Sequence, residues 1–288
     1  MTSILTIGNS LAENALLFLE ELAAAGGVSD LVIGKANLGG CSLEKHWNLV
    51  QQCDLLPQVR PYDLYITGRE TRAATLREAL VMHDWDYVTL QQVSDLSWRK
   101  ETYCPYLMNL YELIKELAPR ARPVMHQTWA YRCDAPLLQE FGLSQEEMFA
   151  MLKEACEEAA RDLSCPVLPC GAAFAKAWAA LRFVPDLIFN LDQPEPLNLP
   201  EQSKSLIVGY YWQTGNTKTG RAELHMDERH GNAKGCYLAG AVWYEMFTGR
   251  EIALNPFCPD GVTREELGIL QHAAHAAAVE YGGPLQNQ

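Results

Sequence analysis

Residues Ile4-Leu5-Thr6-Ile7-Gly8-Asn9-Ser10, near the start of the chain, are the clearest indication of the fold. Its apolar residues form a short run up to Gly8, which is typical of a buried strand. The apolar residues that follow recur at helical spacing, at Ala12, Leu16, Leu19 and Ala23, and Gly26-Gly27 is a helix stop signal. This part of the sequence therefore predicts a strand that turns directly into a helix.

The same alternation of short apolar runs and longer helical patterns continues along the chain. Further strands are expected at residues 30–34, 86–90, 123–127 and 166–169. Helices are expected at residues 71–83, 106–117, 144–163, 172–181 and 233–247, and a last one after the capping pair Thr263 and Glu266. Strands that alternate with helices run parallel and are joined by right-handed crossovers. The sequence thus predicts an α/β fold, a three-layer α/β/α sandwich around a mainly parallel five-stranded sheet, as a single domain over residues 1–288.

Residues 186–221 depart from this alternation. Several prolines interrupt the segment, and a polar run follows them. Long connections without regular structure are often lids or binding loops. We therefore expect a long surface excursion at about residues 186–221, whose role the sequence does not indicate.

The charge of the chain argues against two classes of partner. The 288 residues include 23 Lys and Arg against 36 Asp and Glu, a formal net charge of −13 at pH 7. An acidic surface repels phosphate backbones, so no nucleic-acid partner is expected. No apolar stretch approaches the ~20 residues needed to cross a bilayer, so no membrane partner is expected.

The start of the chain and its cysteines bear on location. The first residues lead directly into the first strand, without the basic and apolar regions of a signal peptide. This predicts a cytoplasmic location, unless a leader has been removed. The nine cysteines lack paired CxxC spacing, so free thiols are expected. No cofactor or metal is expected, and the sequence does not indicate an oligomeric state.

Ser10 is the first candidate for a reacting group. In open parallel sheets, sites form outside the carboxyl ends of the strands, and Ser10 follows the first strand at the mouth of the first helix. The N–H groups and dipole of that helix could stabilise an oxyanion. The alternative is a structural role, because Ser10-Leu11-Ala12-Glu13 matches the S-x-x-E pattern of a helix N-cap. The position of Ser10 taken alone favours the cap.

The second candidate is Asp227-Glu228-Arg229-His230, which lies just before a predicted helix. The three-residue spacing lets one short turn present both side chains to one cleft, where the carboxylate orients the imidazole. An isolated D-x-x-H is common, so its meaning depends on Ser10. A serine after the first strand, combined with an Asp–His pair before the last helices, indicates nucleophilic catalysis.

Together these features resemble the SGNH (GDSL-type) hydrolases, in particular a branch catalogued as a domain of unknown function. Four blocks carry the resemblance in the family's order: residues 4–10, Gly39-Gly40-Cys41-Ser42-Leu43, residues 85–94, and residues 227–230 with the following Gly235-Cys236-Tyr237-Leu238. The resemblance implies a flavodoxin-like sandwich. It also implies that Ser10 is the nucleophile, His230 the general base and Asp227 the group that orients it. The common first block has Asp where this chain has Asn9, at a position not expected to touch the reaction.

The resemblance further implies an oxyanion hole built from the Ser10 N–H, a glycine N–H and an Asn side chain. The glycine would be Gly40, with Gly39 as the alternative. The third block contains no Asn, and we expect Gln91 or Gln92 to donate that hydrogen bond instead. The alternative is that the two glutamines anchor a loop at the end of a strand.

These roles predict a serine esterase that transfers an acyl group through Ser10 to water. The resemblance suggests acetyl esters on a carbohydrate, because members of the superfamily often remove acetyl groups from carbohydrates. The residues expected to contact such a substrate are Gly39, Trp47, Trp129 and Tyr131, and the further aromatic candidates are Tyr210, Tyr211 and Trp212. Core or loop packing is the alternative for each aromatic side chain.

Three other interpretations stay open. His225, Asp227 and His230 could hold zinc or manganese in a metal-dependent hydrolase, with His126 as a further donor. Cys41, beside the glycines, could be a nucleophile, although a small buried thiol is the better interpretation. The chain could also be a non-catalytic member of the fold that binds a ligand in the same cleft.

Overall fold

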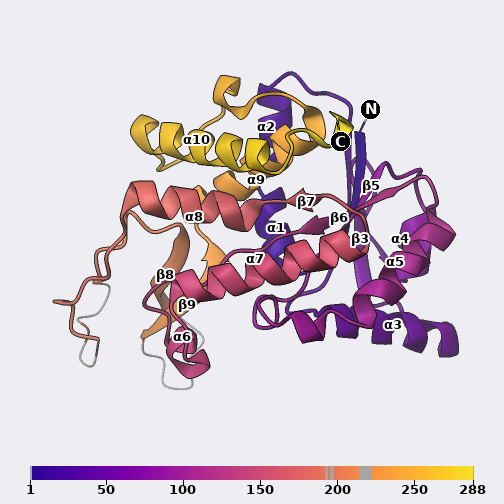
Figure 1. The fold of residues 1–288 in the computed structure, drawn as a ribbon, viewed down its shortest axis with the longest axis horizontal. Helices are drawn as coiled ribbons and strands as arrows, with labels where there is room; N and C mark the ends of the chain where they lie inside the picture. The colour runs from indigo at the N-terminus through magenta and orange to yellow at the C-terminus, as the bar shows by residue number, and fades with distance from the viewer. Residues whose placement is uncertain (1, 192–193, 195–197, 214–221, 288) are drawn as a thin grey trace.

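The computed structural model describes residues 2–191, 194, 198–213 and 222–287. Within them the central sheet has seven strands in the order β4-β3-β2-β1-β5-β6-β7 (Figure 1). The strands are β1 (Thr2–Gly8), β2 (Leu31–Asn37), β3 (Tyr62–Ile66), β4 (Arg72–Ala74), β5 (Tyr87–Leu90), β6 (Arg122–His126) and β7 (Val167–Leu168). Strands β2, β1, β5, β6 and β7 run parallel in that order, so the predicted five-stranded parallel sheet is confirmed.

Strands β3 and β4 add an antiparallel edge that was not predicted. Strand β4 lies in residues 71–83, which were expected to be helical throughout. The helix there, α4 (Leu76–Val81), begins only after Thr75, because Thr75 and Glu78 form a capping box. The helix prediction was wrong for residues 71–75, since a capping side chain sets where the helix starts, and for residues 82–83, which follow the end of α4.

Helices cover both faces of the sheet, and the two larger of the three hydrophobic cores lie between the sheet and these helices. They are α1 (Ser10–Leu16), α2 (Leu19–Ala25), α3 (Leu43–Leu55), α4, α5 (Tyr106–Leu117), α6 (Pro136–Phe141), α7 (Gln145–Asp162), α8 (Cys170–Leu181), α9 (Ala233–Thr248) and α10 (Arg264–Glu280), with 3₁₀ turns at Lys100–Thr102, Ile252–Leu254 and Leu285–Asn287. Successive residues of a strand point to opposite faces. Ile4 belongs to the core with α1, α2, α8, α9 and α10, and Leu5 belongs to the core with α3, α4, α5 and α7. The predicted three-layer sandwich is therefore confirmed (Figure 1).

The first predicted helix is divided in two. Helix α1 ends at Leu16 and α2 starts at Leu19, and both pack against α9. The four apolar residues that predicted this helix are all buried, so the spacing identified the buried face correctly although not the break. Among the described residues, no helix is both long and apolar enough to cross a membrane.

Outside the central sheet, β8 (Ile207–Gln213) and β9 (Glu223–Gly231) form a two-stranded antiparallel ribbon. Strand β8 lies inside the segment expected to have no regular structure, so that expectation is wrong for residues 207–213. Its β-branched and aromatic residues favour a strand, but its partner β9 is mostly polar and shows no apolar alternation. Residues 192–193, 195–197 and 214–221 of the predicted excursion lie outside the described residues.

Candidate active site

The turn between β1 and α1 presents Ser10 at the carboxyl end of the central strand of the sheet. Asn9, not Ser10, is the N-cap of α1, and its side-chain oxygen accepts the N–H of Leu11 at 3.1 Å. The interpretation of Ser10 as the cap is therefore wrong. Ser10 is the first helical residue, and its hydroxyl is available for another partner.

A β-bulge in strand β9 presents Asp227 and His230. Ile207 pairs with Gly231 and Gly209 with Asp227, so β9 advances four residues where β8 advances two. The Asp227 Oδ1 atom accepts the N–H groups of Arg229 (3.2 Å) and His230 (3.0 Å), which folds the bulge around the carboxylate. The expected short turn ahead of a helix is thus a bulged strand.

The structure brings these three side chains together in one hydrogen-bonded chain. The Ser10 Oγ atom lies 2.8 Å from His230 Nε2, and His230 Nδ1 lies 2.8 Å from Asp227 Oδ2. An ionised carboxylate only accepts hydrogen bonds, so the Nδ1–H of His230 donates to Asp227. The Nε2 atom is then left to accept the Ser10 hydroxyl. Two segments 220 residues apart therefore meet in the geometry that nucleophile activation requires.

The Asp227 carboxylate is charged over the ordinary pH range. Burial raises its pKa, but the hydrogen bonds from the His230 ring and from the His230 N–H outweigh burial and bring the pKa down to about 2. A negative charge at this position stabilises the positive charge that His230 acquires when it takes a proton.

A cavity of about 330 Å³ opens over Ser10. Its lining is mostly polar and consists of Asn9, Ser10, Gly40, Val93, Ser94, Tyr211, Met226, Asp227, Glu228, Arg229 and His230. Gly40 has a φ of +60°, a backbone conformation that favours glycine. Ser10 and Gly40 both line this cavity, and their N–H groups have no hydrogen-bond partner among the described residues. Gly39, the alternative glycine and a predicted substrate contact, is exposed and does not line the cavity.

The expectation that Gln91 or Gln92 serves as an oxyanion donor is wrong. The Nε2 of Gln91 donates to Asn9 Oδ1 at 2.7 Å, and its Oε1 accepts from His126 Nδ1 at 2.7 Å. Gln92 accepts the N–H of Leu43 and donates to Thr102. Both glutamines are buried, and neither lines the cavity. They anchor loops at the end of β5, because neighbouring groups already occupy their amides.

The aromatic residues expected to contact substrate mostly lie behind the site. Trp129 and Tyr131 are fully buried, with Trp129 Nε1 donating to the carbonyl of Arg229 at 2.8 Å. Trp47 is half-buried on α3 and packs against the core. These three predictions of substrate contact are wrong because the side chains are used for packing. The remaining candidates are Tyr210, which packs on Arg132, Trp212, which donates to the carbonyl of Asn198, and Tyr211, which lines the cavity.

Two charged residues beside Ser10 were not singled out from the sequence. The Arg229 guanidinium forms an ion pair with Asp95 and lies 4.9 Å from the centre of the Tyr131 ring. The Glu228 Oε2 atom accepts the N–H of Leu137 at the start of α6, beside which the ribbon lies in Figure 1. Their position between Asp227 and His230 in the sequence could have identified them, because a bulge re-aims the side chains of the residues that it inserts.

The alternative metal and thiol sites do not form. Among the described residues, no group of three or more His, Cys, Asp or Glu side chains could hold a metal ion, and His225 stacks on Tyr211 instead. His126 is buried, and desolvation lowers its pKa to about 3. Cys41 is buried too, and desolvation raises the pKa of its thiol to about 12, which disfavours the nucleophilic thiolate.

His46 has a role that the sequence did not reveal. It is fully buried on α3, and its Nε2–H donates to the carbonyl of Gly8 at 3.1 Å, while Nδ1 accepts the Tyr62 hydroxyl at 2.8 Å. Burial lowers the pKa of His46 to about 4, so the ring is neutral. A neutral imidazole therefore holds the end of β1, two residues before Ser10.

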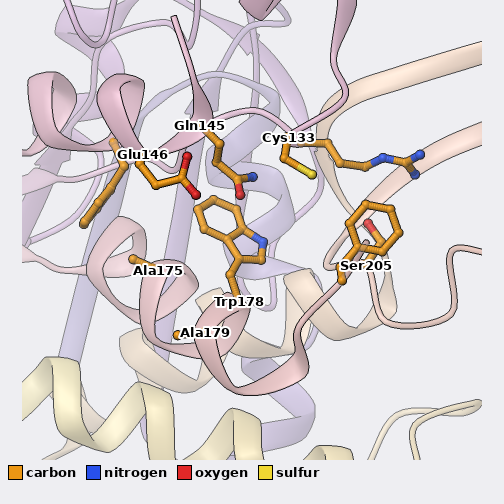
Figure 2. Close-up of a pocket in the computed structure, with 10 residues that line it drawn as sticks. Cys133, Gln145, Glu146, Ala175, Trp178, Ala179 and Ser205 are labelled. Carbon is orange, nitrogen blue, oxygen red and sulfur yellow. The ribbon is translucent and has the colours of Figure 1, made fainter. Parts of the chain in front are cut away.

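A second cavity, of about 370 Å³, lies apart from Ser10 between α7 and α8 (Figure 2). Trp178 forms one wall, and Gln145 and Glu146 point toward it from the start of α7 (Figure 2). None of the site residues predicted from the sequence lines this cavity.

The second cavity borders the base of the ribbon through Arg132. The Arg132 guanidinium forms an ion pair with Asp134 and donates a hydrogen bond to the Gln202 side chain at 2.8 Å. Gly209 has a φ of +71°, and a Cβ at this position would lie 1.7 Å from the Arg132 Nη1 atom. The ribbon can therefore approach Arg132 only because residue 209 is a glycine.

Comparison with known proteins places the chain in a family. The sequence profile of DUF4886, described as a domain of unknown function, matches residues 3–185. A DUF4886 family protein from Bacteroides uniformis is 27% identical, covers 97% of this chain and 95% of its own, and has a TM-score of 0.72. No curated protein matches.

More distant solved structures share less of the fold. A protein from Slackia heliotrinireducens, provisionally assigned to the SGNH hydrolases, is 26% identical over 60% of this chain and 82% of its own, with a TM-score of 0.45. The esterase EstA from Pseudoalteromonas sp. is 15% identical over 58% and 76%, with a TM-score of 0.34. At such TM-scores the likeness says nothing about the chemistry of this chain. The profile match and the full-length similarity to the Bacteroides protein establish that the chain belongs to the DUF4886 family of domains of unknown function.

Proposed function

We propose that the protein is a serine esterase of the SGNH type that hydrolyses short-chain esters through Ser10, His230 and Asp227. One observation carries the proposal: the Ser10 hydroxyl is 2.8 Å from an imidazole whose other nitrogen is 2.8 Å from a charged carboxylate. This arrangement lies at the carboxyl edge of a parallel sheet, at the first residue of a helix.

The proposed reaction has two acyl-transfer steps. His230 Nε2 takes the Ser10 proton while Ser10 Oγ attacks the ester carbonyl carbon, and the carbonyl oxygen becomes an oxyanion. The intermediate collapses, the bond to the alcohol breaks, and His230 gives the proton to the departing alcohol oxygen. Water then attacks the acyl-enzyme with His230 again as base, which releases the carboxylic acid and restores Ser10.

Two backbone donors support the oxyanion in this proposal. Ser10 and Gly40 line the cavity, and their N–H groups have no partner among the described residues. The first-turn N–H groups of α1 add the positive end of its dipole. With both glutamine amides occupied, the proposed oxyanion hole consists of these two N–H groups, and each donor of this kind contributes about 10²- to 10³-fold to the rate.

The lining of the cavity favours a short acyl group and a polar alcohol. A long acyl chain needs apolar surface, whereas the cavity over Ser10 is lined mostly by polar and charged residues. Tyr211 is 41% exposed on β8 and offers an aromatic face on which a sugar ring can stack. We therefore propose acetyl esters, with a carbohydrate as the alcohol part.

Covalent labelling with a fluorophosphonate tests the proposal, because only an activated serine reacts. The wild-type protein should be labelled and should hydrolyse p-nitrophenyl acetate, and Ser10→Ala should lose both reactions. Ser29→Ala, which changes an exposed serine before β2, is the matched control and should behave as wild type. Labelling that survives in Ser10→Ala, or no labelling of the wild-type protein, would overturn the proposal.

The substrate part is tested separately. Acetate release from acetylated sugars is expected to exceed that from p-nitrophenyl acetate in kcat/KM, and p-nitrophenyl octanoate is expected to be a poor substrate. Good hydrolysis of the octanoate ester combined with no release of acetate from sugars would contradict the carbohydrate proposal while leaving the esterase proposal intact.

A further inference from the structure

Two residues of α1 contact two consecutive residues of the bulged strand. Ser10 and Asn14 are four residues apart and therefore lie on the same face of the helix, one turn apart. The Ser10 Oγ atom contacts His230 Nε2 at 2.8 Å, and the Asn14 Oδ1 atom accepts the N–H of Gly231 at 2.9 Å. The second contact involves only the backbone of β9, so it places the strand without using the reacting side chains.

The backbone at Gly231 is held firmly on its other side. Gly231 is buried, and its carbonyl accepts the Cys236 thiol at 3.2 Å. A Cβ at Gly231 would lie 2.9 Å from the Cys236 nitrogen, in the first turn of α9. The residue after His230 is therefore enclosed between α1 and α9, and its N–H points to Asn14.

Other contacts hold the bulge, but they join it to different parts of the molecule. The N–H of Arg132 donates to the carbonyl of Glu228 at 3.0 Å, and Trp129 Nε1 donates to the carbonyl of Arg229 at 2.8 Å. Both donors come from the segment after β6. The Asn14 contact instead joins the strand that carries His230 to the helix that carries Ser10.

We infer that Asn14 is a positioning residue that holds the His230 imidazole within hydrogen-bond distance of Ser10. The inference rests on the proposed function, because it concerns the same serine and histidine. A displacement of about 1 Å between reacting groups can lower a rate about 10²-fold. The expected consequence of losing this contact is therefore a lower kcat with little change in KM, since Asn14 does not line the cavity.

Two substitutions separate positioning from general stability. Asn14→Leu keeps the size of the side chain and removes the acceptor, and we expect fluorophosphonate labelling to slow by about 10- to 100-fold. Asn14→Asp keeps an acceptor for the Gly231 N–H and adds a negative charge near His230, which favours the protonated ring. Its labelling rate should approach that of wild type at alkaline pH, and the midpoint of its pH profile should move upward. Asn48→Leu, the same change at an exposed position of α3, is the control and should label at the wild-type rate.

Hydrogen exchange of the Gly231 N–H gives a readout that does not depend on activity. Exchange should be faster in Asn14→Leu than in wild type, and it should remain slow in Asn14→Asp and Asn48→Leu. Labelling of Asn14→Leu within twofold of wild type would overturn the inference, as would equal slowing in Asn14→Asp at every pH. A wild-type protein that is not labelled at Ser10 would refute the proposed function. In that case, hydrogen exchange would still test whether Asn14 holds the Gly231 N–H. Equal protection of this N–H in Asn14→Leu and wild type would show that it does not.

Discussion

The two halves of the candidate site are built in different ways. Ser10 lies on a strand–turn–helix unit inside the sandwich, where β1 pairs with β2 and β5, and Asn9 and His46 hold the turn. Asp227 and His230 lie in a bulge of a ribbon outside the central sheet. Ile207 anchors the ribbon in the core, but the bulge itself is held by hydrogen bonds with Asn14, Trp129 and Arg132 and by the Arg229–Asp95 ion pair. Ser10, the proposed nucleophile, is thus part of the core architecture, whereas the position of His230, the proposed base, depends on how the ribbon packs against the rest of the protein. Changes to the ribbon should therefore affect activity more than stability, and changes around Ser10 should affect both.

The largest effect is expected from the ribbon. Asp227→Asn removes the charge that orients His230 and should lower kcat by about 10⁴-fold while the protein stays folded at neutral pH. Esterase kinetics and a thermal melt measure the two quantities. Asp63→Asn, at an exposed position of β3, is the matched control. A loss of less than about tenfold in Asp227→Asn would show that this carboxylate is not the orienting group.

A change beneath Ser10 should lower the free energy of unfolding more than a change in the ribbon does. Gln91→Leu leaves the buried Nδ1–H of His126 without its acceptor and removes a donor to Asn9, so the free energy of unfolding should fall by about 1–3 kcal/mol. Urea denaturation measures it, with Gln52→Leu at an exposed site of α3 as control. If Gln91 were an oxyanion donor after all, kcat would fall by about 10²-fold or more with the stability unchanged.

Acid should lower the free energy of unfolding within a defined pH range, because it protonates Asp227 in the ribbon. The pKa of Asp227 is about 2 in the folded protein, below the ordinary value of 3.8, because the hydrogen bonds from His230 outweigh the effect of burial. The stabilisation is present above pH 4 and is lost as the pH falls from 4 to 2, and it amounts to about 2 kcal/mol. Stability measured across this range should drop less in Asp227→Asn than in wild type. Parallel curves for the two proteins would contradict this assignment.

The smallest effect is expected at the rim of the cavity. Tyr211→Ala removes the aromatic face on β8 and should raise KM for an acetylated sugar by about two- to tenfold, the size of one ring contact. The KM for p-nitrophenyl acetate serves as the internal control and should change little. An equal increase for both substrates would mean that Tyr211 shapes the cavity and does not recognise the sugar.

Local sequence patterns were sufficient to predict the parts of the fold that depend on interactions between residues close in the sequence. The parallel strands, the helix α5 and the capping boxes at Ser144 and Thr263 agree with the sequence, because apolar spacing and capping side chains act within a few residues. The edge strands β3 and β4 and the ribbon were missed. Their pairing depends on partners elsewhere in the chain, and β9 has no apolar alternation to reveal it.

The same distinction between local and long-range interactions applies to the candidate site. Ser10 and the Asp227–His230 pair could be named from the sequence, since strand ends and short spacings are local features. The structural roles of Gln91, Trp129 and Tyr131 could not be predicted, because burial and competing hydrogen bonds depend on neighbours that only folding brings close. The same holds for Asn14, whose partner Gly231 is 217 positions away.

The layered α/β architecture and the identity of three polar groups follow from the order of the residues, since hydrophobic periodicity and side-chain chemistry can be recognised without a structure. Three features became visible only in the folded chain: the ribbon packs against α1, its bulge turns His230 toward Ser10, and the two glutamines are buried. Those outcomes depend on contacts between segments remote in the chain, whose strength is set by distance and burial in three dimensions.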